Sequence, residues 1–83
     1  MDFKELREKI DEADTKLTAA FEERLEAVRE IGEIKKKDKS PIYDAKRESE
    51  IIERLSDMVK DENKAAVEEL YRAIFAISKE LEK

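Results

Sequence analysis

The first part of this 83-residue chain keeps one helical period of apolar residues without interruption, from about Phe3 to about Lys37. Steps of four and three residues pass through Leu6, Ile10, Ala13, Leu17, Ala20, Arg24, Ala27, Ile31 and Ile34, and only Arg24 is not apolar. At a rise of about 1.5 Å per residue, such a helix is a rod roughly 50 Å long. The short remainder of the chain cannot cover this face alone, so we expect a homodimer.

The remainder is predicted to form two shorter helices. The only strong helix breaker is Ser40-Pro41, and Asp44 is a good N-cap for a helix to about Lys60. The apolar face of this second helix is Ile51, Ile52, Leu55, Met58 and Val59. Asn63 is a plausible cap for a third helix, which reaches the C-terminus with Val67, Leu70, Tyr71, Ile74, Ile77 and Leu81 on one face. The expected fold is all-α, with residues 1–83 as a single domain of one long and two shorter helices.

Composition narrows the range of functions. Charged residues make up 49% of the chain, and the net charge of -5 argues against a nucleic-acid-binding face. The chain has no cysteine or histidine and no Gly-rich phosphate loop, so we expect no zinc site and no Cys-His or Ser-His-Asp catalysis. No signal peptide or membrane-spanning run is evident, so we expect a cytoplasmic protein. Abundant Lys and Glu with few thermolabile residues suggest a thermophile.

Polar residues on the inner faces are the candidate site. An arginine side chain between packed helices must either pair with an acidic residue or bind an anion. Arg7 and Lys35 lie beside the apolar face of the first helix that contains Arg24. Arg47 and Glu48 extend the inner face of the second helix. Ser78 and Glu82 follow Ile74 at four-residue spacing on the third helix. We therefore predict a polar pocket for a small, multiply charged anion.

Each residue alone also has a simpler interpretation. Arg7 could form a surface pair with Asp11, and Arg24 could pair with a glutamate of a partner helix. Lys35 could belong to a solvated helix end, and Glu48 with Asp44 could be acidic residues of a helix start. Ser78 and Glu82 would each be unremarkable alone. The joint pattern is what favours a site.

That joint pattern resembles the all-helical (AroQ-type) chorismate mutases over nearly the whole chain. It consists of Leu6–Asp11, Glu23-Arg24, Ile31–Lys35, Pro41-Ile42 and Asp44–Glu48, with Ser78 behind them. The resemblance implies an intertwined homodimer with two active sites, in which two long first helices pack together. It also implies the Claisen rearrangement of chorismate to prephenate in the biosynthesis of Phe and Tyr. This reaction needs no nucleophile, metal or cofactor. The enzyme has only to hold the substrate in its reactive conformer and to stabilise the charge that develops as the ether bond breaks.

The resemblance also implies residue roles. Arg24 would bind a substrate carboxylate, Arg7 would reach in from the other chain, and Lys35 would lie near the ether oxygen. Arg47 would orient the carboxylate side of the pocket, Ser78 would assist at a carboxylate, and Glu48 with Asp44 would accept a hydrogen bond from the ring hydroxyl. Glu82 departs from the glutamine of many bacterial members. Either Glu82 is held protonated and donates to the ether oxygen, or this position is not essential to the reaction. The first alternative predicts activity that rises toward acidic pH.

Two alternative functions remain open at this point. Isochorismate-pyruvate lyases share the helical scaffold, although the cluster of Asp44, Arg47 and Glu48 fits the mutase pattern better. A non-enzymatic helical dimerisation module would explain the apolar stripes and the charge, but not the arginine in the seam together with polar residues on the other inner faces.

Overall fold

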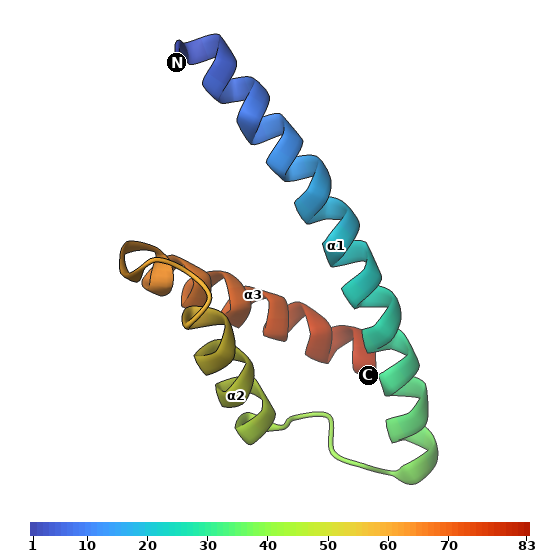
Figure 1. Cartoon of the computed structure of the whole chain (residues 1–83). Coiled ribbons are helices and arrows are strands. Elements are labelled where there is room, and N and C mark those ends of the chain that lie inside the picture. Colours follow the sequence, from blue (N-terminus) through green and yellow to red (C-terminus); the bar gives the residue numbers. More distant parts are fainter.

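The computed structural model describes residues 1–83 and contains three α-helices and one short 3-10 turn. Helix α1 spans Phe3–Asp38, α2 spans Ala45–Ser56 and α3 spans Lys64–Glu82, with the 3-10 turn η1 at Asp61–Asn63 before α3 (Figure 1). The prediction of an all-helical fold with one long and two shorter helices is confirmed. None of these helices combines the length and the apolarity that crossing a lipid bilayer requires.

Helix α1 is closed at both ends by local interactions. Asp2 caps its start, because the carboxylate Oδ1 accepts a hydrogen bond from the backbone N–H of Glu5 at 2.8 Å. Its end is marked by Lys39, whose left-handed backbone (φ 57°) lets its N–H donate to the carbonyl of Lys35. Pro41 then prevents continuation of the helix. The predicted extent of this helix is therefore correct to within one residue.

Helix α2 is shorter than the sequence pattern indicated. Asp44 is its N-cap as predicted, and Oδ1 of Asp44 accepts from the N–H of Arg47 at 3.0 Å. The helix ends at Ser56 rather than near Lys60, and Met58 lies in the following turn with 71% of its surface exposed. The prediction of Met58 on the inner face was wrong, because a turn side chain no longer follows the helical period.

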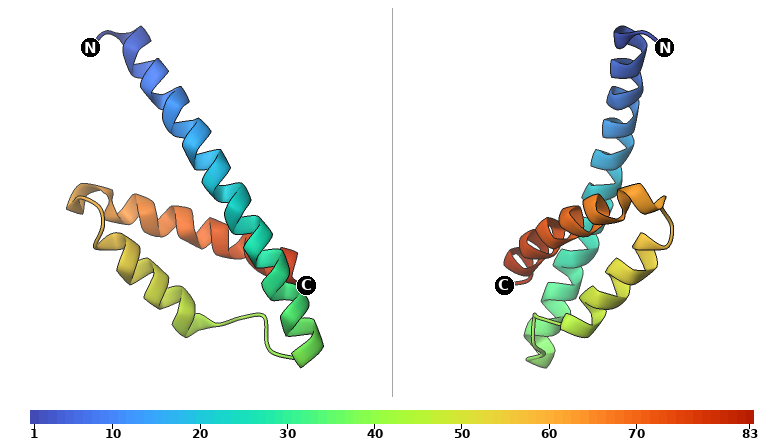
Figure 2. Two further views of the ribbon diagram at one scale, coloured as in Figure 1. Left: turned by 45° about the vertical axis from the view of Figure 1, so that its right-hand side comes forward. Right: turned by 90° about the vertical axis from the view of Figure 1, so that its left-hand side faces the viewer.

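Helix α3 returns along α2 and crosses the C-terminal half of α1 (Figures 1 and 2). Asn63 occupies its cap position, but the Asn63 side chain makes no capping hydrogen bond. The small core lies where the three helices meet, at Val28, Ile51, Ile74 and Phe75. Phe75 is 5% exposed although it was not among the predicted apolar residues, whereas Leu70 and Ile77 of the predicted face are exposed.

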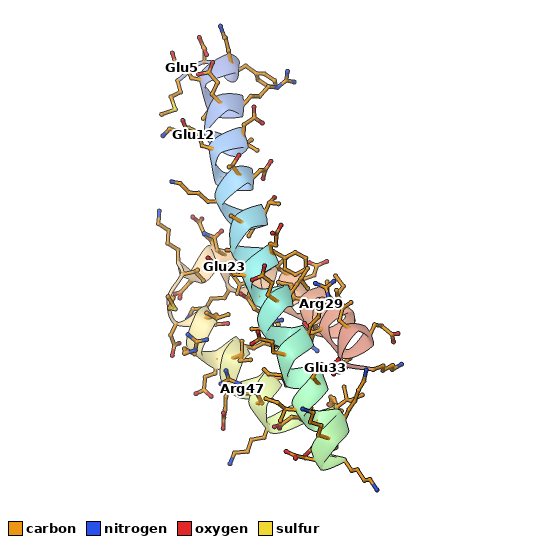
Figure 3. All side chains as sticks on the ribbon, turned by 90° about the vertical axis from the view of Figure 1, so that its right-hand side faces the viewer. Glu5, Glu12, Glu23, Arg29, Glu33 and Arg47 are labelled. Atoms are coloured by element: carbon orange, nitrogen blue, oxygen red, sulfur yellow. The ribbon has the colours of Figure 1, made fainter.

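The N-terminal half of α1 extends away from the other two helices (Figures 1 and 2). This gives the chain an elongated shape of 53 × 24 × 16 Å. Glu5 and Glu12 lie along this projecting part (Figure 3). Much of the predicted apolar seam is exposed in the single chain: Leu6, Ile10, Leu17, Ile31 and Ile34.

Candidate active site

A pocket of about 270 Å³ lies between the C-terminal halves of α1 and α3, the start of α2 and the segment that joins α1 to α2. Seven of the eight predicted site residues line this pocket: Arg24, Lys35, Asp44, Arg47, Glu48, Ser78 and Glu82. Its apolar wall is made by Ile31, Ile42, Ile51 and Phe75. Charged groups enclosed by apolar walls are typical of a site that binds a small polar ligand.

Arg24 of α1 is held against α3 by a hydrogen bond and by aromatic rings. Its Nη1 donates to Oγ of Ser78 at 2.7 Å, and the buried Ser78 hydroxyl in turn donates to the carbonyl of Ile74 at 2.8 Å. The Arg24 Cζ also lies 6.0 and 5.8 Å from the ring centroids of Tyr71 and Phe75. No carboxylate lies within ion-pair distance of Arg24. Its remaining donors are therefore free for an anion from outside this chain.

Lys35 and Glu82 form an ion pair on one side of the pocket. The Lys35 Nζ lies 2.7 Å from Oε1 of Glu82, and both side chains are largely shielded, with 24% and 10% of their surface exposed. Lys35 also donates to the carbonyl of Ile42 at 3.1 Å. One ammonium group thus connects the last turn of α3 to the segment that leads into α2. Glu82 is buried rather than a solvated terminal residue.

The backbones of α1 and α3 touch at Gly32, which brings Glu82 to Lys35. A Cβ placed on Gly32 would lie 3.0 Å from the Glu82 Cα and 3.2 Å from the Glu82 carbonyl oxygen. Real Cβ atoms essentially never come closer than this limit, and backbone atoms cannot rotate away. The absence of a side chain at this position therefore permits the close docking of the last turn of α3.

The start of α2 contributes three polar residues. Asp44 caps the helix, and Glu48 lies in its first turn, where a negative charge is favoured by the helix dipole. Arg47 lies on the same turn (Figure 3), is exposed, and has no carboxylate within ion-pair distance. The pocket therefore contains a second arginine without an acidic partner in this chain.

Sequence reasoning missed two residues of the pocket, Phe75 and Lys79. The signal was present: Phe75, Ser78, Lys79 and Glu82 are spaced i, i+3, i+4 and i+7, which places them on one face of α3. Steps of four from Ile74 reached only Ser78 and Glu82. Lys79 Nζ lies 3.2 Å from Oε2 of Glu48 and 4.1 Å from the centroid of the Tyr43 ring.

Arg7 is the predicted site residue that the single chain does not bring to the pocket. It lies near the start of α1, is exposed, and has its Cζ 4.3 Å from the ring centroid of Phe3. No ion pair joins Arg7 to Asp11. A contribution of Arg7 to the site of a second chain stays a prediction.

Comparison with known proteins identifies the family. The chain is 34% identical over 87 residues to a bifunctional chorismate mutase/prephenate dehydratase of Aquifex aeolicus (strain VF5), with 99% of this chain and 24% of that protein covered. It is 37% identical over 59 residues to a chorismate mutase of Methanocaldococcus jannaschii, with 71% of this chain and 60% of that protein covered. The chain thus spans about a quarter and about three fifths of these relatives. No solved structure gave a significant match.

The family model for chorismate mutase type II matches residues 6–83, which include every predicted site residue and every lining residue of the pocket. The chain belongs to the chorismate mutase type II family.

Proposed function

We propose that this protein is a chorismate mutase, an isomerase that converts chorismate to prephenate by a Claisen rearrangement in the biosynthesis of Phe and Tyr. The observation that carries the proposal is the pocket arginine, Arg24, which is held by Ser78 and has no carboxylate partner. Lys35 and Arg47 line the same pocket. Chorismate is a dianion, and fixed guanidinium groups bind carboxylates strongly in a shielded site.

The proposed mechanism uses binding and electrostatics without a covalent step. Arg24 holds one substrate carboxylate and Ser78 assists by accepting a hydrogen bond that fixes the guanidinium. Arg47 orients the carboxylate side of the pocket. Glu48 accepts a hydrogen bond from the ring hydroxyl, with help from Asp44. These contacts keep the flexible substrate in its compact reactive conformer, which lowers the entropic part of the barrier.

Lys35 and Glu82 act where the ether bond breaks. In the proposed complex the Lys35 ammonium lies near the ether oxygen and a carboxylate, so positive charge is present where negative charge develops. Glu82 can donate to the same oxygen only in its protonated form. The distance of 2.7 Å between Lys35 Nζ and Glu82 Oε1 supports placing both groups at one point of the substrate, and protonation of Glu82 would break the ion pair that the two groups form in this structure.

We further propose that the protein acts as an intertwined homodimer, in which Arg7 of each chain enters the site of the other. Support comes from the projecting half of α1, where Leu6, Ile10 and Leu17 are exposed. A second, mostly apolar pocket of about 370 Å³ lies between α1 and α3, lined in part by Leu17, Phe21, Leu70, Tyr71, Ile74 and Ile77. A second long helix that covers these surfaces would remove them from water, which the single chain does not achieve.

The test is turnover of chorismate by the purified protein, with the product identified by NMR. The expected product is prephenate, and Arg24→Ala is expected to reduce kcat/KM by about 100-fold or more, because it removes a charge that holds the substrate. Circular dichroism of Arg24→Ala should show unchanged helix content.

A wild-type protein that leaves chorismate intact would contradict the proposal. The next substrate would then be isochorismate, and salicylate with pyruvate would identify a lyase on the same scaffold. Turnover of neither substrate, with no thermal stabilisation by a bicyclic transition-state analogue, would indicate a dimerisation module without enzymatic function.

A further inference from the structure

Lys79 is the charged residue of the pocket that neither the sequence pattern nor the proposed mechanism uses. It lies on α3 directly after Ser78, and only 33% of its side-chain surface is exposed. Its Nζ is 3.2 Å from Oε2 of Glu48 on α2 and 4.1 Å from the centroid of the Tyr43 ring. One ammonium group thus contacts residues from two other parts of the chain.

Glu48 has no other cationic partner. The ion pairs of the structure join its carboxylate only to Lys79, and no side-chain hydrogen bond is made to it. A glutamate side chain with three rotatable bonds loses considerable conformational entropy when it is held in one orientation. The direction of the Glu48 carboxylate in the pocket therefore depends on Lys79.

The contact with Tyr43 adds a second constraint. Tyr43 immediately precedes Asp44, the residue that caps α2, and the Lys79 ammonium lies over its ring. On the other side of the pocket Lys35 makes an equivalent set of contacts, with Glu82 and with the carbonyl of Ile42. Two lysines from two helices thus each hold one pocket glutamate and one residue of the segment that connects α1 to α2.

We infer that Lys79 is a positioning residue of this site, which orients the carboxylate of Glu48 toward the substrate and holds Tyr43 at the entrance to α2. The inference rests on the proposed function, in which Glu48 accepts the hydrogen bond of the substrate's ring hydroxyl. A hydrogen-bond acceptor with a fixed direction favours one bound conformer, and a displacement of about 1 Å can cost up to 100-fold in rate.

The experiment compares kcat and KM for chorismate among variants at this position. Lys79→Met keeps an unbranched side chain one heavy atom shorter and removes its charge, and it is expected to lower kcat/KM by about 10-fold or more. Lys79→Arg keeps a cation that can reach Glu48 and is expected to restore most of this loss. The matched control is Lys64→Met, because Lys64 lies on the same helix and forms an ion pair with Asp61 outside the pocket.

A double-mutant comparison separates positioning from direct substrate binding. If Lys79 acts through Glu48, adding Lys79→Met to Glu48→Gln should lower kcat/KM little further, because the group that Lys79 orients is already changed. Losses that multiply in the double variant would overturn the inference, since Lys79 would then act on the substrate independently. Equal kinetics for Lys79→Met and Lys64→Met would also overturn it.

Two controls keep the result interpretable. Thermal unfolding followed by circular dichroism checks that each variant is folded, and Lys79→Gln replaces Lys79→Met if the apolar side chain prevents folding. Turnover of chorismate by the wild-type protein tests the proposed function separately. Wild-type turnover of chorismate with an unaffected Lys79→Met variant would reject only the role of Lys79, whereas an inactive wild-type protein would reject the proposed function itself.

Discussion

At the scale of single residues, the pocket contains more charge than a helical bundle of this size needs for stability. Lys35 with Glu82 and Lys79 with Glu48 form two shielded ion pairs. Such pairs contribute little net stability, because desolvation offsets much of their attraction. Arg24 and Arg47 lack acidic partners altogether. The arrangement is better explained by the binding of an anionic ligand than by folding.

Glu82 provides the prediction at this scale. In the proposed mechanism only the protonated carboxyl of Glu82 can donate to the substrate's ether oxygen, so kcat/KM should rise as the pH falls from about 8 to about 5. Glu82→Gln supplies an amide donor at every pH and should flatten this profile. Chorismate turnover measured across that range checks both statements. A wild-type kcat/KM that stays constant over the whole pH range would show that Glu82 does not donate a hydrogen bond to the ether oxygen in the transition state.

At the scale of helices, the contact between α1 and α3 at Gly32 determines where Glu82 lies. Glycine inside a helix normally destabilises it by about 0.5 to 1 kcal/mol relative to alanine. Here a Cβ would lie 3.0 Å from the Glu82 Cα, so the last turn of α3 would have to move by a few tenths of an ångström. The close contact thus outweighs the local helical preference.

Gly32→Ala is expected to lower the melting temperature instead of raising it, and to reduce kcat/KM by about 10-fold, because Glu82 moves away from Lys35. Circular dichroism melts and chorismate kinetics measure the two effects. Glu33→Ala is the matched control, since it is the adjacent exposed position of α1 and makes no ion pair. A Gly32→Ala variant more stable than the parent and fully active would show that α3 adjusts its position without cost.

At the scale of the whole molecule, the single chain leaves its longest helix half uncovered. Only seven of 83 residues are buried, and the projecting half of α1 has no partner within the chain (Figure 2). A core of this size is marginal for an independent domain. The proposed homodimer would cover the exposed seam and would bring Arg7 of one chain to the pocket of the other.

Mixing two inactive variants tests this arrangement. Arg7→Ala and Arg24→Ala should each be inactive alone, and refolding them together should restore about a quarter of the wild-type activity. Half of the random dimers are then heterodimers, and one of the two sites in each heterodimer contains only wild-type residues. Chorismate turnover of the refolded mixture measures the recovery. No recovery, with dimer formation confirmed by light scattering, would place both arginines of each site in one chain.

The sequence by itself determined the number and order of the helices, the extent of α1 and the start of α2. The uninterrupted period from Phe3 predicted α1, and its end at Asp38 follows from the break at Ser40-Pro41. Asp44 was correctly predicted to cap α2. These features depend on local interactions, which involve residues a few positions apart and can be recognised in the chain itself.

Only the tertiary structure decided which side chains meet. Helical period shows which face a residue lies on, but the rotation and crossing of two helices determine its partner on the other helix. The pairing of Glu82 with Lys35, the pairing of Glu48 with Lys79 and the backbone contact at Gly32 all join residues from different helices. Side-chain packing, which acts between positions far apart in the sequence, is the physical cause of these contacts, and for that reason they could not be predicted from the sequence alone.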